Sequence, residues 1–316
     1  MRIFRISLAC LCLGLLAAPA TSSADIPIRI GIGDQQVKTF DNVKFQQAKF
    51  KRIRYFVRWD VMEHKEPRLA ARAFVKRARA EGMSVLLHLS TNDFASKQGH
   101  RPSVREYKAA VRRLVPYFRK LGVREFGVWN EANHASQPTY NSPNHAALYF
   151  REMYRAVKGR CRSCIVVALD VLDQRGVEKY MRSFYRRLSP TYRKRATVVG
   201  IHNYGDVNRE RTTYTRRIIQ TTHDYTKKVQ FWFTETGGLV NFGRSFPCDV
   251  DRARDRLRWM FSLANRYRRS GVKRLYIYQW TGAGCDQRFD AGLTNPDGTV
   301  RPGYTYVRKK LPNYLR

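Results

Sequence analysis

Apolar residues along the chain recur with two different spacings. Over residues 28–33 they occupy every second position, which is the spacing of a strand. Over residues 67–82 they recur every three or four positions and form one stripe, which is the spacing of an amphipathic helix. The two spacings predict strands at 28–33, 53–59, 83–89, 124–129, 165–169, 197–201, 229–233 and 275–278, and helices at 40–50, 67–82, 103–122, 142–159, 177–188, 214–225, 249–269 and from 302 onward.

Local signals mark the ends of several predicted helices. Ser103 and Glu106 have the spacing of a capping box, and Gly122 follows the last apolar position of the same helix. Pro67 stands in the first turn of an earlier helix, where a proline is tolerated. Pro116 lies inside the helix at 103–122 and is expected to bend it.

Eight predicted strands alternate with about eight predicted helices, and no linker or low-complexity stretch interrupts them. This alternation is typical of a parallel sheet, and eight units close such a sheet into a barrel. An open doubly wound sheet is the alternative, but no glycine-rich phosphate loop follows the first strand. We therefore predict an α/β fold, a single (β/α)8 TIM-barrel domain over residues 25–316.

The first 24 residues have the composition of a secretory signal. Arg2 and Arg5 precede an apolar run over residues 6–18, and small residues for cleavage follow at 18–20 and 22–24. The run is too short to span a bilayer comfortably, and no later segment is long and apolar enough to do so. The sequence therefore predicts a signal peptide at 1–24 and a secreted, soluble, monomeric mature protein.

Four cysteines remain after the predicted leader: Cys161, Cys164, Cys248 and Cys285. An even number of cysteines in an exported chain favours disulfides. Cys161 and Cys164 could instead form a redox or metal pair, but no second such pair and no suitably spaced histidine accompany them. Cys248 and Cys285 follow the last two predicted strands, so we expect them to form a disulfide at the rim of the barrel.

The chain is strongly basic, with 60 Lys and Arg residues against 25 Asp and Glu residues and a formal charge of +35. Removal of a leader that holds two arginines leaves +33. The cations recur along the predicted helices, which indicates solvated outer faces. Such a charge favours polyanions, so an acidic glycan is an attractive partner. No zinc finger or RNA-binding aromatic motif is present, and we expect no specific nucleic-acid partner.

Two glutamates stand where predicted strands end. Glu131 and Asn130 follow the apolar strand at 124–129, and Glu235 follows the strand at 229–233. A carboxylic acid at the mouth of an apolar strand can have its pKa raised by desolvation and act as a general acid. An isolated Asn-Glu pair would be only a polar turn, but the second glutamate makes a catalytic pair the better interpretation.

In a (β/α)8 barrel the carboxyl ends of all strands converge on one face. Two opposed carboxylates surrounded by an arginine, two histidines and a tryptophan suit cleavage of a glycosidic bond. The residues predicted to meet on that face are Arg58, His88, Asn130, Glu131, His202, Tyr204, Glu235 and Trp280.

Four short motifs resemble the clan of retaining barrel glycosidases that includes cellulases, mannanases and family 39 β-xylosidases. They are W-N-E-A-N at 129–133, H-N-Y at 202–204, T-E-T-G at 234–237 and the tryptophan at 280. The resemblance covers the mature chain as architecture, but only these motifs as residues. It implies that Glu131 is the acid/base, that Glu235 is the nucleophile, and that no metal or cofactor is required.

The resemblance also implies roles for the surrounding side chains. Asn130 is expected to hold the hydroxyl beside the anomeric carbon, and Tyr204 to hydrogen-bond Glu235. His202 is expected near Glu131, and Arg58 is expected to favour the charged form of Glu235. His88 and Trp280 are expected to line the sugar's pocket and to stack under the sugar ring, respectively.

Several of these residues have a structural alternative. His88 could be an interior histidine with its hydrogen bonds satisfied, and Arg58 could pair only with Asp60. The other tryptophans favour packing roles, and Trp232 is expected to face the helices because it is out of phase with Glu235. The acidic residues predicted to be surface groups are Glu63, Glu66 and Asp93, although Asp93 follows the third predicted strand and could contact substrate.

Three functions remain open from the sequence. The leading one is a secreted retaining glycoside hydrolase acting on β-linked poly- or oligosaccharides. A second is a barrel that binds anionic glycans or cell wall without cleaving them, which the charge motivates. A third is a transglycosylase, because a sugar can capture the same covalent intermediate in place of water.

Overall fold

The computed structural model describes residues 27–93 and 99–314, and the predicted signal peptide at 1–24 lies outside these residues. Nine strands, all paired in parallel, form one sheet within the described part of the chain. Their bounds are β1 Arg29–Gly33, β2 Arg52–Arg58, β3 Ser84–Ser90, β4 Glu125–Gly127, β5 Ile165–Val167, β6 Leu169–Leu172, β7 Val198–His202, β8 Gln230–Thr236 and β9 Val272–Tyr278.

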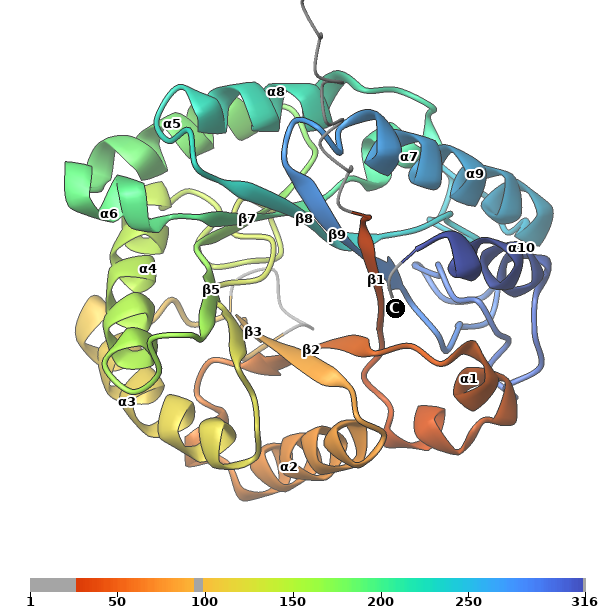
Figure 1. Cartoon of the computed structure of the whole chain (residues 1–316), viewed down its shortest axis with the longest axis horizontal. Helices are drawn as coiled ribbons and strands as arrows, with labels where there is room; N and C mark the ends of the chain where they lie inside the picture. Colours follow the sequence, from red (N-terminus) through yellow and green to blue (C-terminus); the bar gives the residue numbers. More distant parts are fainter. Residues whose placement is uncertain (1–26, 94–98, 315–316) are drawn as a thin grey trace, which may run out of the picture.

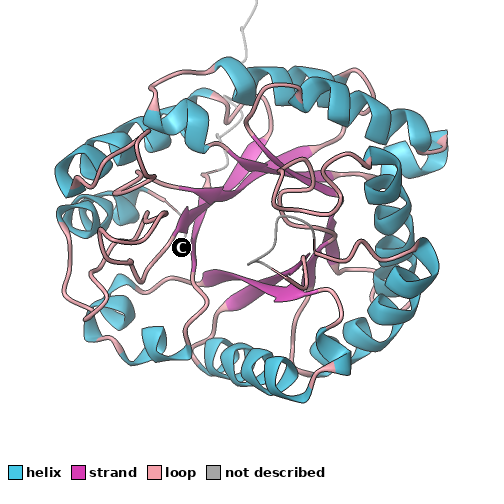
Figure 2. Ribbon diagram, turned by 180° about the vertical axis from the view of Figure 1, so that it is seen from behind, coloured by secondary structure: helices cyan, strands magenta, loops and turns pink. Residues whose placement is uncertain are grey.

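The sheet curves into a ring that helices surround (Figure 1; from behind in Figure 2). Its strand order is β5-β4-β3-β2-β1-β9-β8-β7-β6, so β5 and β6 are the two edges. Only Ala168 separates these two strands, and its N–H donates to the carbonyl of Val198 at 2.9 Å. They are therefore two parts of one barrel strand, and the predicted (β/α)8 barrel is confirmed.

Helices connect successive strands and pack their apolar stripes against the outside of the ring. The predicted capping box of Ser103 and Glu106 starts α3, and Pro116 lies inside that helix. The short helices α6 and α7 were not predicted, because neither is long enough to show a helical period. The bounds are α1 Val43–Ala48, α2 Lys65–Ala80, α3 Val104–Lys120, α4 Pro143–Lys158, α5 Val177–Arg187, α6 Pro190–Arg195, α7 Tyr204–Asn208, α8 Thr213–His223, α9 Val250–Arg266 and α10 Pro302–Lys310, with short 3-10 helices η1 Val37–Asp41, η2 Val61–Glu63 and η3 Leu311–Asn313.

Trp232 corrects one expectation about the barrel interior. It packs inside the ring with Leu86 and Tyr276, and the Arg274 guanidinium lies 3.6 Å from its ring centroid. The register of β8 shifts against β7 between Trp232 and Glu235, and it shifts against β9 between Phe233 and Thr236. A bulge of this kind changes the phase of the side chains, so Trp232 and Glu235 can both point inward.

Charge is distributed unequally between the two ends of the barrel. Helices run antiparallel to the strands, so their last turns lie at the amino ends of the strands and their first turns at the carboxyl ends. Cations near helix C-termini interact favourably with the helix dipole. The cations in the last turns of helices are Arg77, Arg79, Arg119, Lys120, Arg155, Lys158, Arg186, Arg187, Arg193, Lys194, Arg195, Arg266, Arg308, Lys309 and Lys310, and the acids in first turns include Glu66, Glu106, Glu178, Asp206 and Asp251.

Both predicted disulfides are present. Cys161 and Cys164 close the connection between α4 and β5, at the amino ends of the strands. Cys248 and Cys285 join the loops that follow β8 and β9, at the opposite rim. In the described residues, none of the helices has the length and apolar character needed to cross a membrane.

Candidate active site

Two glutamates meet at the carboxyl ends of the strands. Glu131 follows β4 in a left-handed backbone conformation with φ 44°, and Glu235 lies near the end of β8. One carboxylate oxygen of each, together with a ring nitrogen of His202, lie within 4.8 Å of one another. The two carboxylates are therefore close enough to act on opposite sides of one bond.

Glu235 is held by two donors. The Arg54 Nη1 donates to Oε2 at 2.7 Å, and the Tyr204 hydroxyl donates to Oε1 at 3.1 Å. Glu235 is only 8% exposed, so this ion pair lies in a region of low dielectric where it is weakly screened. The bond from Tyr204 is the one that the sequence motifs implied.

The arginine beside Glu235 is Arg54, not Arg58. Arg58 donates instead to both carboxylate oxygens of Asp60, at 2.5 and 2.9 Å, which was the alternative interpretation of that residue. Arg54 stands four positions earlier on β2, faces the same side of the strand and is fully buried. Arg58 was expected because it ends the predicted strand. The long side chain of Arg54, from the middle of the same strand, reaches Glu235 instead.

Arg54 also orders the other members of the cluster. Its Nη2 donates to the Asn130 Oδ1, and its Nε donates to the His88 Nδ1 at 3.2 Å. The Asn130 amide nitrogen makes no hydrogen bond to the described part of the chain, so it can donate to a ligand. A planar guanidinium carries five N–H donors on three nitrogen atoms, so it can serve acceptors on several sides at once, whereas a lysine has a single donor atom.

Asp170 is a member of the cluster that the sequence reasoning missed. It lies on β6, is 1% exposed, and accepts a hydrogen bond from the Thr234 hydroxyl. Its Oδ2 lies 2.9 Å from the His202 Nε2 and 3.6 Å from the Arg54 Nη2. The available signal was an aspartate directly after the predicted apolar strand at 165–169, because an acid is rarely buried without a charged partner.

His202 lies between Asp170 and the glutamates. Its Nδ1 is 3.0 Å from the Glu131 Oε1 and 3.6 Å from the Glu235 Oε2. Burial alone lowers the pKa of His202, but Asp170 and Glu235 outweigh burial and raise that pKa to about 10. The imidazole is therefore protonated at neutral pH, with a proton on Nδ1 facing Glu131.

Burial and neighbouring charges shift the pKa values of the three carboxyl groups in different directions. Burial raises the pKa of Glu235, and Glu131 adds to this rise against the opposing effect of His202 and Arg54. Burial would also raise the pKa of Glu131, but the hydrogen bond and charge of His202 outweigh it, and the pKa is lowered. The pKa of Asp170 is lowered despite burial, because His202, His88 and Arg54 surround it.

The charges of this cluster do not cancel. Arg54 and His202 are its cations, while Asp170, Glu131 and Glu235 are its potential anions. One excess negative charge remains when all three acids are ionised, and uptake of a single proton by the glutamate pair removes it. Interacting acids of this kind titrate as a pair.

His88 is an interior histidine and does not line an open pocket. It is completely buried, and burial lowers its pKa to about 3, so it is neutral. It accepts the bond from Arg54 on Nδ1, and its Nε2 lies 3.6 Å from the Asp170 Oδ2. Gly127 of β4 lies against its ring, and a Cβ at that position would overlap the imidazole. A strand glycine thus makes room for a buried polar side chain.

Trp280 corrects a second expectation. It is 1% exposed and packs edge-on against Phe45 and Tyr304, with ring centroids 5.1 and 5.5 Å away. It therefore belongs to the core between the barrel and its helices, and it cannot stack under a sugar as expected. Tyr278, two residues earlier, is half-buried on the inward face of β9, and burial together with Glu235 raises its pKa well above the usual range.

Loops after the strands hold the rest of the rim. Asp173 accepts from the backbone N–H groups of Gly205 and Asp206, at 2.8 and 2.5 Å, and so fixes the start of α7 that carries Tyr204. Asn241 donates to the carbonyl of Cys285 at 3.1 Å beside the Cys248–Cys285 disulfide. These contacts position the Tyr204 hydroxyl and the loops around it.

The three convergent groups Glu131, His202 and Glu235 have a donor set that could in principle hold a cation. However, the Arg54 guanidinium already bonds Glu235, and His202 is itself protonated. Two fixed cations therefore supply the positive charge that a metal ion would bring. The arrangement fits proton transfer between carboxyl groups better than metal binding.

Comparison with known proteins gives structural neighbours only. No protein-family profile matches the sequence, and no curated protein matches it. Among solved structures, a glucosidase from Croceicoccus marinus has a TM-score of 0.69 at 13% identity, covering 91% of this chain and 67% of that one. A family 39 glycoside hydrolase from the gut symbiont Bacteroides cellulosilyticus WH2 has a TM-score of 0.61 at 16% identity, covering 92% and 64%.

A third neighbour, a GH39 β-xylosidase from Caulobacter crescentus, has a TM-score of 0.60 at 17% identity, covering 90% of this chain and 71% of that one. This chain thus spans about two thirds of the length of these neighbours. Identities this low show a shared barrel fold and nothing finer. They agree with the fold of the clan that the sequence motifs resemble.

Proposed function

We propose that the protein is a secreted retaining glycoside hydrolase that cleaves O-glycosidic, β-linked bonds of poly- or oligosaccharides by double displacement. The observation that carries the proposal is the short distance between Glu131 and Glu235. One carboxylate oxygen of Glu131 lies within 4.8 Å of one carboxylate oxygen of Glu235. Retaining glycosidases hold their two carboxyl groups about 5–5.5 Å apart, whereas inverting ones leave roughly 6.5–9.5 Å for a water. The fold of the structural neighbours agrees with this chemistry.

In the first step, the Glu235 carboxylate attacks the anomeric carbon. The bond from that carbon to the leaving oxygen breaks, and Glu131 gives this oxygen a proton. The product is a glycosyl ester on Glu235. Arg54 opposes the rise that burial causes in the pKa of Glu235, and Arg54 and Tyr204 together orient its oxygens, which suits a nucleophile.

In the second step, Glu131 takes a proton from water, and the water oxygen attacks the same carbon. The ester bond to Glu235 breaks, and the sugar leaves with its original configuration. Transfer of the glycosyl group to a sugar hydroxyl would follow the same path. The present geometry favours neither acceptor.

His202 supplies the proton that the first step needs. In the free enzyme its charge lowers the pKa of Glu131, so Glu131 is ionised. A bound sugar would displace water from Glu131, which is the more exposed of the two glutamates, and thereby favour its neutral form. The Nδ1 proton of His202, 3.0 Å from the Glu131 Oε1, can then move onto the carboxylate.

Substrate contacts follow from the groups left unoccupied. The Asn130 amide is positioned to bind the hydroxyl beside the anomeric carbon. Tyr278 replaces Trp280 as the aromatic floor, and Phe289 lies beside it with ring centroids 6.2 Å apart. Aromatic faces of this kind suit the apolar face of a sugar ring.

Export is the remaining part of the proposal. The predicted leader at 1–24 and the two disulfides both fit an oxidising compartment. Mass spectrometry of protein recovered from the culture medium should find a chain that begins after residue 24. A chain found only inside the cell with its leader intact would contradict export.

Substitution of the two glutamates tests the mechanism. Glu235→Ala and Glu131→Ala should each lower turnover of an activated aryl glycoside by about 10³-fold or more, because each removes one chemical step. Azide should rescue Glu131→Ala with retention of configuration, since it can attack the intermediate without a base. Azide should rescue Glu235→Ala with inversion, because it replaces the nucleophile.

Glu63→Ala provides the matched control. Glu63 lies on the same side of the barrel but is exposed and pairs with Arg113. Its removal should leave turnover within about twofold, as for a typical surface change. Parental activity in both Glu131→Ala and Glu235→Ala, on a substrate that the parent cleaves, would refute the proposed function.

A further inference from the structure

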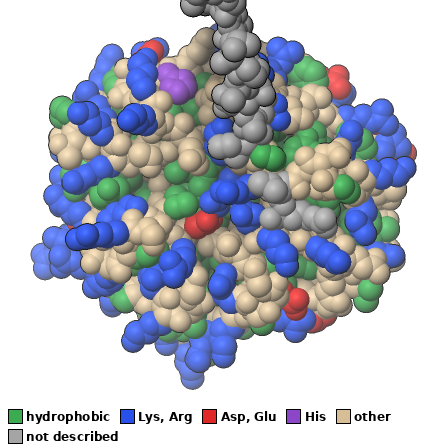
Figure 3. Space-filling view, in the orientation of Figure 1, with side chains coloured by type: hydrophobic (Ala, Val, Ile, Leu, Met, Phe, Trp, Pro, Cys, Tyr) green, Lys and Arg blue, Asp and Glu red, His purple; other side chains and the backbone are tan. Residues whose placement is uncertain are grey.

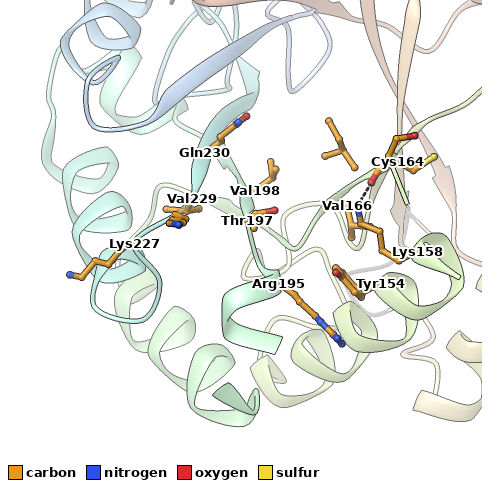
Figure 4. Close-up of a pocket in the computed structure, with 13 residues that line it drawn as sticks. Tyr154, Lys158, Cys164, Val166, Arg195, Thr197, Val198, Lys227, Val229 and Gln230 are labelled. Atoms are coloured by element: carbon orange, nitrogen blue, oxygen red, sulfur yellow. Dashed lines mark hydrogen bonds between the residues drawn. The ribbon is translucent and has the colours of Figure 1, made fainter. Parts of the chain in front are cut away.

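A pocket of about 460 Å³ opens at the amino ends of the strands, on the face opposite Glu131 and Glu235. It lies between β5 and β7, which line it. β5 is one edge of the sheet and does not pair with β7. Figure 4 shows Tyr154 and Lys158 on α4, Arg195 on α6, and Lys227 on the segment before β8, with the Lys227 ammonium directed outward from the other labelled side chains. A second hollow of about 380 Å³ shares Tyr154, Lys158 and Arg195 with it.

The cations of this pocket have no acidic partners. Four of the residues that line it are Lys or Arg and none is Asp or Glu. Within the described residues, no carboxylate lies at ion-pair distance from Arg195, Lys227 or Lys228. Arg195 stacks instead on Tyr154 and Tyr192, with its guanidinium carbon 5.2 and 5.0 Å from the ring centroids.

The described residues around the pocket, at the amino ends of the strands, offer no free carboxylate to neutralise its cations. Three carboxylates lie in or beside the helix-to-strand connections of the described chain, and each is already paired. Glu81 pairs with Arg77 at 3.3 Å, Asp224 with Arg182 at 3.1 Å, and Glu125 is buried against Arg274 at 2.6 Å. Figure 3 views this face, where Lys and Arg side chains are frequent and acidic ones are few.

The pocket also presents groups that suit sugar hydroxyls. Thr197 and Ser163 are exposed and carry hydroxyls, and the Gln230 side chain adds an amide. The Lys158 ammonium donates to the carbonyls of Arg162 and Cys164, at 2.8 and 2.6 Å, so its position is fixed and one N–H remains free.

Membranes and nucleic acids fit this face less well. The exposed large apolar side chains of the described residues, such as Val43, Leu69 and Phe242, all lie in loops after strands or near helix starts, at the other end. Among the residues that the structure describes, no large apolar side chain is therefore exposed on this face to enter a bilayer. Base stacking needs an open aromatic face, whereas Arg195 covers that of Tyr154.

We propose that this pocket, defined by Lys158, Arg195, Lys227 and Lys228, binds an acidic polysaccharide that bears carboxylate groups. Bound there, the polymer leaves the opposite face of the barrel free. The site is separate from the proposed hydrolytic centre and does not depend on it. It would keep the protein on an anionic glycan while the other face remains open to substrate.

Binding of a fluorescein-labelled oligogalacturonate, followed by fluorescence anisotropy at low salt, tests the site. The triple variant Arg195→Gln, Lys227→Gln and Lys228→Gln should raise Kd by about tenfold or more, as expected for the loss of three charge contacts. The control triple variant Arg72→Gln, Lys76→Gln and Arg112→Gln removes the same charge from the outer faces of α2 and α3. Its Kd should rise less than about twofold.

Equal weakening in the two variants would overturn the proposal, because it would mean that diffuse charge binds the probe. Tighter binding to phosphatidylglycerol vesicles or to a single-stranded DNA of equal charge, lost in the pocket variant, would also overturn it. Anisotropy measures binding and not turnover, so neither result depends on hydrolysis. Turnover of a neutral aryl glycoside should be unchanged in both triple variants.

Discussion

Each end of the barrel contains a buried arginine bonded to a glutamate. At the carboxyl ends, Arg54 lies 2.7 Å from Glu235, and at the amino ends Arg274 lies 2.6 Å from Glu125. Arg274 otherwise contacts the Trp232 ring and the Tyr276 hydroxyl, and Arg52 interacts electrostatically with the same pair, so this cluster has no excess acid. Arg54 belongs to a cluster with one acid more than it has cations. An ion pair alone is structural, whereas an excess acid beside it provides a proton that can move.

Removal of each arginine sharpens this comparison and should produce the largest effects. Arg54→Met and Arg274→Met should each lower the free energy of unfolding by roughly 3–5 kcal/mol, because each leaves a buried glutamate without its partner. Only Arg54→Met should also lower kcat/KM of the folded protein, by about 10²–10³-fold, because it removes a preorganised donor from the nucleophile. Denaturant unfolding and aryl glycoside kinetics measure the two quantities.

Comparable losses of kcat/KM in both arginine variants, measured where both are folded, would break the comparison. The Arg274–Glu125 pair at the amino ends of the strands would then contribute to turnover as much as the Arg54–Glu235 pair at the carboxyl ends. A second outcome against it is parental kcat/KM in Arg54→Met. That result would show that Glu235 does not need its ion pair with Arg54 for turnover.

A smaller effect is expected from Asp170→Asn. Loss of this charge 2.9 Å from His202 should lower the pKa of His202 from about 10, so the imidazole loses its proton at lower pH. We expect kcat to fall about 10–100-fold with little change in KM, as for a residue that acts through another. The alkaline limb of the kcat profile should move to lower pH. An unchanged alkaline limb would show that Asp170 only fills space.

A further prediction concerns pH and the two interior histidines, whose pKa values are shifted in opposite directions. His88 is neutral, with a pKa of about 3. Its contribution to the free energy of unfolding is therefore complete above its ordinary pKa near 6.5 and is lost as pH falls toward 3. His202 has a pKa of about 10, so its contribution is complete below 6.5 and is lost as pH rises toward 10. The free energy of unfolding should therefore peak near pH 6.5 and decline by a few kcal/mol (on the order of 1.4 per pKa unit) on each side.

Urea unfolding at about pH 4, 6.5 and 9 measures this profile. Asp170→Asn should flatten the decline above pH 6.5, because it removes the main cause of the His202 shift. A parent protein whose stability rises from pH 6.5 to 9 would contradict the protonated state of His202.

Most of the fold could be predicted from the sequence, because the two spacings of apolar residues are local. The strands at 53–59 and 83–89 correspond closely to β2 and β3. The short helix at Tyr204–Asn208 gave no period to detect, and the division of one barrel strand at Ala168 depends on its neighbours. Such features are set by tertiary pairing.

The candidate site was predicted only at positions that end strands. Glu131, His202, Tyr204 and Glu235 are brought together. Arg54 comes from mid-strand and reaches the cluster through its long side chain, and Asp170 lies on a strand that extends past its predicted end at residue 169. Trp280 failed for a different reason: its place in the chain fitted, but its ring turns into the core. The direction of a side chain beyond the last strand residue depends on the loop, which spacing alone does not determine.

The stereochemistry of hydrolysis is the most direct test of whether Glu235 forms a covalent intermediate with the sugar. Proton NMR of a β-aryl glycoside during the first minutes of cleavage identifies the anomer that forms before mutarotation. Because one oxygen of Glu131 and one of Glu235 lie within 4.8 Å, we expect the β-anomer to appear first. Initial formation of the α-anomer would mean that water attacks directly, and it would contradict a covalent intermediate on Glu235.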